Sequence, residues 1–259
     1  MKLDGKCCII TGAGDGIGRG IALAFADEGA AVAICDINSE ALEATHGLVE
    51  KTGAKTFSKA IDIRDVNAIT AFVRDAAHAL GGVDVLVNNA AVMPGSRLEI
   101  LTEETIDHVL AVNLKAPILF TRQVFPEMKK SGGGSIIHMS SVTGHNGFPE
   151  VAIYGATKGG LMALARGHAM ELAPHNIRVN SVSPGTVDSP MLHRFVEENA
   201  DDPALALREF DQIHPRGTIA SIREIANVCV FLASDDSANI TATDIRCDGG
   251  YCVQGVQPK

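Results

Sequence analysis

The sequence predicts an α/β fold in which a doubly wound parallel sheet carries helices on both faces. Short and nearly continuous apolar runs alternate with amphipathic stretches from the start of the chain to about residue 247. Apolar runs of this kind are typical of parallel strands buried on both faces, and the stretches between them have the length of crossover helices. The alternation has no break, and 46% of the residues are hydrophobic, so we expect residues 1–259 to form a single domain of the Rossmann type.

The predicted elements follow in order along the chain. In the first helical stretch Ile17, Ile21 and Phe25 recur at intervals of four and form one apolar stripe, and Gly29 follows, as is common after a helix. The candidate strands are Cys7–Thr11, Ala31–Cys35, Lys55–Ile61, Val83–Val87, Ser135–Met139, Arg178–Val182 and Thr243–Cys247. The candidate helices are Gly16–Glu28, Ser39–Thr52, Val66–Leu80, Glu103–Lys129, Ala152–Ala173 and Ile222–Ala233.

One stretch interrupts this rhythm. Residues 189–216, here called the lid segment, are polar and charged and contain Pro190, Pro203 and Pro215. A loop of this length inside a compact domain usually serves function. We therefore expect an irregular loop that forms a lid over the substrate.

Charge and composition argue against several classes of partner. The net charge is −9 and the sequence pI is about 5.4, which disfavours a nucleic-acid partner because phosphate backbones need basic patches. No run of 18 apolar residues occurs and the first residues do not resemble a secretory leader, so we expect a cytoplasmic protein without a membrane partner. The six cysteines have no C-x-x-C spacing and the histidines form no metal-binding motif, so we expect neither a disulfide framework nor a metal site.

A glycine-rich turn, TGAGDGIG at residues 11–18, joins the first predicted strand to the first helix. Glycines at such a turn let the backbone approach a diphosphate, and the helix N-terminus stabilises its charge. Asp36 ends the second strand, where a carboxylate binds ribose hydroxyls and repels a 2′-phosphate; Asp15 adds negative charge to the turn. These features favour NAD over NADP, although Asp36 could instead simply cap the next helix.

The second half of the chain contains a candidate acid–base pair. Tyr154 and Lys158 lie four residues apart in a predicted helix and so share one face. A nearby ammonium lowers the pKa of a phenol, and such a tyrosine exchanges protons as a general base or acid. Ser141 follows a predicted strand and lies 13 residues before Tyr154, at the sheet edge where the site is expected. A tyrosine and a lysine four residues apart are also common as surface pairs. The prediction therefore depends on their occurring together with the glycine-rich turn, Asp36 and Ser141.

In this combination the sequence resembles the short-chain dehydrogenase/reductase family over nearly its whole length. The resemblance implies a catalytic tetrad of Asn113, Ser141, Tyr154 and Lys158, in which Tyr154 exchanges the proton and Ser141 holds the substrate oxygen. It also implies a homotetramer. Ala91 departs from the glycine that many members carry after N-N-A, which affects only the local loop. The residues implied to bind the cofactor are Gly12, Asp15, Gly16, Ile17, Gly18, Asp36, Asp62, Ile63, Asn89, Ala90, Tyr154, Lys158, Val187 and Ser189.

The expected function is NAD-dependent hydride transfer to or from a small secondary alcohol or ketone. His145, Asn146 and Arg194 are the polar candidates for substrate binding, and they would suit a sugar, a sugar acid or another polar hydroxy compound. Charged lid residues could equally face water. Two alternatives stay open: an enzyme resembling 3-oxoacyl-[acyl-carrier-protein] reductase, and a regulator that binds NAD without turnover.

Overall fold

The central sheet has parallel strands only, and its order confirms the doubly wound prediction. The computed structural model describes residues 1–95 and 97–254. From one edge to the other the strands are β3 (Thr56–Ala60), β2 (Ala31–Asp36), β1 (Cys7–Thr11), β4 (Val85–Asn88), β5 (Gly134–Met139), β6 (Ile177–Pro184) and β9 (Asp244–Cys247). The order reverses between β1 and β4, and at such a switch point α/β sheets bind ligands outside the carboxyl ends of their strands.

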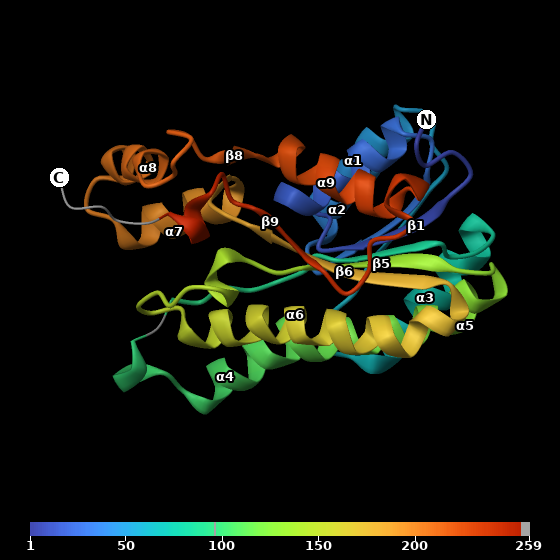
Figure 1. Ribbon diagram of the computed structural model, residues 1–259, viewed down its shortest axis with the longest axis horizontal. Helices are drawn as coiled ribbons and strands as arrows, with labels where there is room; N and C mark the ends of the chain where they lie inside the picture. The colour runs from blue at the N-terminus through green and yellow to red at the C-terminus, as the bar shows by residue number, and fades with distance from the viewer. Residues whose placement is uncertain (96, 255–259) are drawn as a thin grey trace.

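Helices cover both faces of this sheet (Figure 1). One face carries α1 (Gly16–Asp27), α2 (Ser39–Glu50) and α9 (Ile222–Ala233), and the other carries α3 (Val66–Leu80), α4 (Glu103–Leu110), α5 (Ala116–Lys130) and α6 (Ala152–Leu172). Each face has its own apolar core: Ile21 and Ile225 belong to the first, Phe72 and Phe120 to the second. Because both faces are buried, the strands read as continuous apolar runs in the sequence.

Local sequence signals set the helix boundaries. The Asp65 side chain accepts a hydrogen bond from the backbone N–H of Asn67 at the start of α3, and Gly81 ends that helix with a left-handed φ of 103°. Ser221 and Glu224 form a reciprocal capping box at the start of α9. Short 3₁₀ helices also occur at Leu98–Ile100, Val142–Gly144, Ala173–His175, Asp235–Ser237 and Tyr251–Val253.

The predicted helix Glu103–Lys129 is divided in the structure. A π-helical turn, Ala111–Lys115, separates α4 from α5, and Asn113 lies within it. A π turn adds one residue to the helical path and is often found at functional sites. Hydrophobic spacing cannot reveal such an insertion, because the pattern on either side remains helical.

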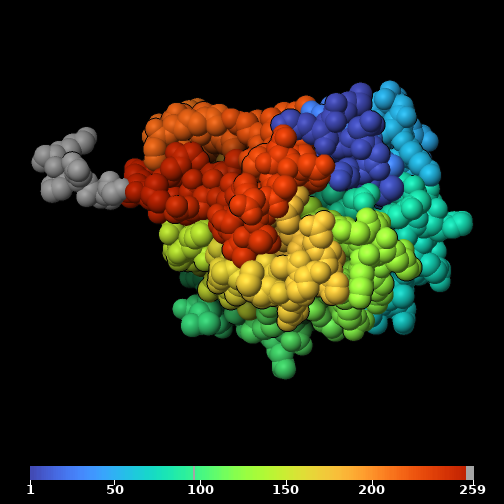
Figure 2. Space-filling view, turned by 45° about the vertical axis from the view of Figure 1, so that its right-hand side comes forward, coloured from blue at the N-terminus to red at the C-terminus, as the bar shows by residue number. Residues whose placement is uncertain are grey.

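The prediction of an irregular loop over residues 189–216 is wrong. This lid segment holds two helices, α7 (Pro190–Asn199) and α8 (Pro203–Gln212). Pro190 and Pro203 are their first residues, where a missing N–H costs nothing. The short strands β7 (Val187–Asp188) and β8 (Ala220–Ser221) pair with each other on either side of the segment. In Figure 2 the lid segment, in orange, lies beside the C-terminal residues, in red, at one end of the molecule.

No helix within the described part of the chain is long and apolar enough to cross a membrane.

Candidate active site

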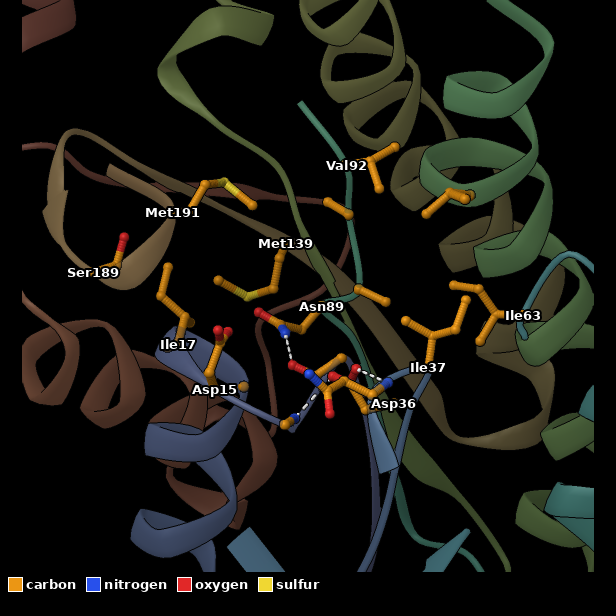
Figure 3. Close-up of a pocket in the computed structure, with 18 of the residues that line it drawn as sticks. Asp15, Ile17, Asp36, Ile37, Ile63, Asn89, Val92, Met139, Ser189 and Met191 are labelled. Carbon is orange, nitrogen blue, oxygen red and sulfur yellow. Dashed lines mark hydrogen bonds between the residues drawn. The ribbon is translucent and has the colours of Figure 1, made fainter. Parts of the chain in front are cut away.

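A cavity of about 550 Å³ opens at the carboxyl edge of the sheet. Its lining comes from the carboxyl ends of β1 to β6 and the segments that follow them, together with α4, α6 and the lid segment (Figure 3). Its position matches the switch point of the strand order. The predicted site residues in this lining are Gly12, Asp15, Gly16, Ile17, Gly18, Asp36, Asp62, Ile63, Asn89, Ala90, Tyr154, Lys158, Ser189 and Arg194.

The glycine-rich turn is packed directly against the end of β4. The Asn89 amide donates hydrogen bonds to the carbonyl oxygens of Thr11, at 3.0 Å, and Gly12, at 2.9 Å. A Cβ atom on Gly12 would lie 2.6 Å from the Ala90 Cα, and one on Gly18 would lie 2.0 Å from the Gly12 carbonyl oxygen. No side chain fits at Gly12 or Gly18, so the backbone of the turn is accessible at the start of α1. This arrangement suits a diphosphate.

Asp36 lies at the end of β2 and is held by backbone N–H groups. Its carboxylate accepts hydrogen bonds from the N–H of Gly14, at 2.9 Å, and of Asn38, at 3.0 Å. The cap of α2 is Asn38, whose side chain accepts from the Ala41 N–H, so the alternative that Asp36 merely caps this helix is wrong. These bonds fix the carboxylate at the mouth of the glycine turn.

The other two carboxylates among the described lining residues are paired with arginine. The Arg64 guanidinium lies 2.5 Å from the Asp62 carboxylate. It donates hydrogen bonds to this carboxylate and thereby lowers the pKa of Asp62. Asp15 lies 3.2 Å from Arg194 of α7. Asp36 is held by backbone dipoles instead, so its charge faces the cavity with the least neutralisation.

Two isoleucines form an apolar end of the cavity. Ile37 and Ile63 lie side by side in Figure 3, each next to one of the carboxylates just described. Ile37 is 70% exposed although it is a large apolar residue. An apolar pair of this kind, with Ile37 exposed and Ile63 half-buried, suits the faces of a planar ring such as a purine.

Tyr154 and Lys158 are both buried in α6 and both line the cavity. The Lys158 ammonium donates a 2.7 Å hydrogen bond to the Met139 carbonyl oxygen at the end of β5 and lies 5.3 Å from the centre of the Tyr154 ring. The Ser140 hydroxyl donates to the Lys158 carbonyl oxygen, at 2.8 Å, which gives Ser140 a structural role. The Ser141 hydroxyl accepts a 3.2 Å hydrogen bond from the Thr143 N–H, and it lies close enough to Tyr154 to lower the pKa of the phenol.

Burial controls the ionisation of this pair. It raises the pKa of Tyr154 to about 12, against a smaller lowering by the hydrogen bond with Ser141. Burial also lowers the pKa of Lys158 to about 7. The expectation that Lys158 brings the pKa of Tyr154 below its ordinary value is not met in the chain by itself, and a contribution of Lys158 in that direction stays a prediction. Loss of solvent outweighs the neighbouring amine, which is directed at the Met139 carbonyl.

Asn113 lies in the π turn behind the cavity. Its side chain exchanges two 2.9 Å hydrogen bonds with the backbone of Val92 and donates to the Thr157 hydroxyl, at 3.3 Å. Thr157 in turn donates to the Tyr154 carbonyl oxygen. Asn113 thus connects the segment after β4 to the helix that carries the tyrosine.

Some predicted residues are not among the described residues that line the cavity. Asn113 and Ser141 lie just behind the lining and reach it through the contacts given above. Val187 is buried in β7, and Asn146 also lies outside the lining. The His145 ring lies 2.9 Å from the Asp244 carboxylate and 3.3 Å from the Ser183 hydroxyl, so it serves a polar contact with β6 and β9.

The lining also contains residues that sequence reasoning did not assign to the cofactor or the substrate in the predicted site. They include Ile37, Arg64, Val92, His108 and Met139. Ile37 directly follows Asp36 and Arg64 lies two residues after Asp62, so their proximity to these predicted carboxylates along the chain was the available signal. His108 comes from α4, and nothing in its local sequence indicates that it reaches the cavity.

Comparisons with known proteins agree with this geometry. A family model described as "Enoyl-(Acyl carrier protein) reductase" matches residues 12–252. The chain is 38% identical to the 3-oxoacyl-[acyl-carrier-protein] reductase FabG of Thermotoga maritima over 98% of this chain and 100% of that protein. A putative short-chain dehydrogenase/reductase from Burkholderia xenovorans superposes with a TM-score of 0.94 at 34% identity, covering 98% and 99% of the two chains. NAD⁺-bound xylitol dehydrogenase gives a TM-score of 0.90 at 31% identity, with 96% and 100% covered.

The contact between Gly18 and Gly12 leads to a stability prediction. Gly18→Ala should destabilise the fold by about 1–3 kcal/mol, because its methyl group would overlap the Gly12 carbonyl oxygen. Gly47 lies in α2, and a methyl group added there would have no atom within 4 Å, so Gly47→Ala is the matched control and should stabilise by up to about 1 kcal/mol. Urea unfolding of both variants tests this, and equal effects would contradict it.

The buried lysine leads to a prediction of pH dependence. Its folded-state pKa of about 7 lies below the unfolded value near 10.4, so between these values the unfolded chain binds more protons. The free-energy cost of burying the charged ammonium is fully present below pH 7 and is lost as the pH rises towards 10. Lys158→Met should therefore stabilise the protein by roughly 2 kcal/mol at pH 6.5, and by less at pH 9.

Thermal or urea unfolding at both pH values measures this difference. Lys129→Met, on the exposed end of α5, is the control and should show no such trend. A gain from Lys158→Met that stays constant between pH 6.5 and pH 9 would show that burial does not lower the pKa of Lys158.

Proposed function

The chain belongs to the short-chain dehydrogenase/reductase family, and from this premise we propose that it transfers a hydride between a secondary alcohol or its ketone and NAD. The observation that carries this proposal is the presence of Tyr154 and Lys158 in the same cavity as the glycine turn and Asp36. A dinucleotide along the turn would bring its reactive ring towards the tyrosine. NAD, when bound, supplies the hydride chemistry.

The residues of the chain would then divide the binding of the dinucleotide. The backbone of the glycine turn at Gly12, Gly16 and Gly18 and the N-terminus of α1 would hold the diphosphate. Asp36 would accept hydrogen bonds from the hydroxyls of the adenosine ribose, and its charge would repel the 2′-phosphate of NADP. Ile37 and Ile63 would enclose the adenine. The NAD-bound state of the similar xylitol dehydrogenase supports this choice of cofactor.

Tyr154 would move the proton of the substrate oxygen. With its pKa raised to about 12, the phenol holds its proton at neutral pH and is ready to act as the general acid in ketone reduction. In alcohol oxidation it must accept a proton, and the positive charge of Lys158 beside the ring would stabilise the anionic form. Ser141, whose hydroxyl lowers the pKa of Tyr154, would donate its single O–H to the same substrate oxygen.

The side chains around the cavity narrow the proposed substrate class. His145 is engaged with Asp244 and Arg194 with Asp15, so two of the three polar side chains expected to recognise substrate serve other contacts. Met139, Met191 and Val92 line the cavity instead. We therefore favour a secondary alcohol or ketone with apolar carbons next to the reacting carbon over a sugar acid. We also propose that the lid segment, with Met191 in α7, closes over this substrate.

A 3-oxoacyl-[acyl-carrier-protein] reductase activity is the second candidate, favoured by the similarity to FabG. Such an enzyme must dock an acidic carrier protein, whereas this chain has a net charge of −9. A panel of secondary alcohols, ketones, polyols and 3-oxoacyl thioesters, each with NAD(H) and NADP(H), separates the two. Absorbance of the reduced nicotinamide is the readout. We expect turnover with simple alcohols or ketones and NAD(H). Turnover confined to thioesters and NADPH would replace our proposal.

Removal of the phenolic hydroxyl tests the acid–base role. Tyr154→Phe should lower kcat by about 10²–10⁴-fold while NADH still binds, because the cavity keeps its shape and loses only the proton donor. The other tyrosine of the chain, Tyr251, provides the control, and Tyr251→Phe should keep kcat within a few-fold. Stopped-flow turnover and NADH fluorescence titration measure the two properties. A regulator without catalysis would be unaffected by either substitution.

Removal of the carboxylate tests cofactor choice. Asp36→Ala should weaken NAD binding and improve NADP binding, and we expect the ratio of the two kcat/KM values to move towards NADP at least tenfold. Asp65→Ala is the control, because Asp65 is a carboxylate in the segment after β3 that does not line the cavity. If Asp36→Ala leaves the cofactor ratio where it was, our assignment of that carboxylate is wrong.

A further inference from the structure

Asp15 is an unexpected residue in a turn that would hold a diphosphate. It lies at the N-cap of α1, but its side chain makes no capping hydrogen bond, and it lines the cavity. Its side chain is 47% exposed, so the carboxylate is available to neighbouring charges. A negative charge at this point opposes the binding of another anion. Some other feature of the chain must offset it if the turn is to bind a dinucleotide.

Arg194 lies against this carboxylate, although it is 179 residues further along the chain. Its guanidinium donates to the Asp15 carboxylate at 3.2 Å, and the arginine also lines the cavity. The position of the arginine is set by α7, in which Leu192 and Val196 are buried and Ser189 caps the first turn. The start of α7 lies next to the turn, because a Cβ atom on Gly16 would be 3.6 Å from the Cδ of Pro190.

We propose that Arg194 is a cofactor-binding residue that acts by neutralising Asp15, so that the lid segment must lie against the glycine turn for the dinucleotide to bind tightly. This inference rests on the proposed function, since it assumes a diphosphate at the turn. It assigns Arg194 to the cofactor and not to a substrate carboxylate. At the start of α7 the His193 ring and the Asp188 carboxylate contact each other at 2.7 Å, so neither is directed at Asp15.

The alternative is that Asp15 and Arg194 form an ordinary surface ion pair, which contributes little to stability or to binding. The chain contains a close match for comparison. Arg223 of α9 and Asp27 at the other end of α1 lie 3.1 Å apart, with side chains 58% and 49% exposed, against 56% and 47% for Arg194 and Asp15. Neither member of this second pair lines the cavity. The two pairs differ in location and hardly at all in geometry or exposure.

Calorimetric titration with ADP-ribose and with adenosine tests the proposal without any turnover. Arg194→Gln should weaken ADP-ribose binding roughly three- to tenfold, because the uncompensated Asp15 then repels the diphosphate. Adenosine has no phosphate, so its affinity should stay unchanged, which also shows that the groove is intact. Arg194→Lys keeps the charge and should bind ADP-ribose nearly as the parent protein does. Arg223→Gln should behave as the parent protein with both ligands.

The double variant identifies the cause. If Arg194 acts through Asp15, adding Asp15→Asn to Arg194→Gln should restore ADP-ribose binding to at least the parent affinity. Continued weak binding by the double variant would overturn the proposal, and so would parent-like binding of ADP-ribose by Arg194→Gln. A parent protein that binds neither ADP-ribose nor NADH would instead disprove the proposed function, and this inference with it.

Discussion

The close approach of the glycine turn to the end of β4 is the constraint on which the rest of the cavity depends. Asn89 fixes this approach through the carbonyl groups of Thr11 and Gly12, and the turn leaves no room for a methyl group at Gly18. With the turn held there, α1 starts at the switch point of the sheet and its N-terminus faces the cavity. The Asp36 carboxylate accepts a hydrogen bond from the Gly14 N–H in this turn. The path of the backbone therefore sets the position of the carboxylate.

At Tyr154 and Lys158 burial opposes the charged forms that the proposed proton transfer needs. Removal from water disfavours both the phenolate of Tyr154 and the ammonium of Lys158. A hydrogen bond to the Met139 carbonyl oxygen holds the lysine in place, and Ser141 lowers the pKa of the tyrosine against the effect of burial. Their positions are therefore well defined while their charges are costly. A site of this kind gives up stability for reactivity.

The sequence was sufficient for the doubly wound sheet and the main cavity residues for a clear physical reason. Strands buried on both faces read as apolar runs, and the carboxyl ends of parallel strands meet at one edge, so residues after β1, β2 and β4 had to come together. The same reasoning failed for His145, because its distance from Ser141 along the chain says nothing about Asp244, which arrives from β9. It also failed for α7 and α8, whose polar surfaces have few buried residues and resemble a loop.

The pairing of Asp15 with Arg194 shows why the lid segment could not be understood from its own composition. Considered alone, its charges suggested a solvated surface or a contact with substrate. In the structure one of these charges is part of the electrostatics of a turn at the other end of the chain. Of the three carboxylates that line the cavity within the described ranges, two are balanced by arginine, and Asp36 is held by backbone N–H groups. The least neutralised negative charge among these three is therefore that of Asp36, the position at which we propose that the chain distinguishes a ribose hydroxyl from a phosphate.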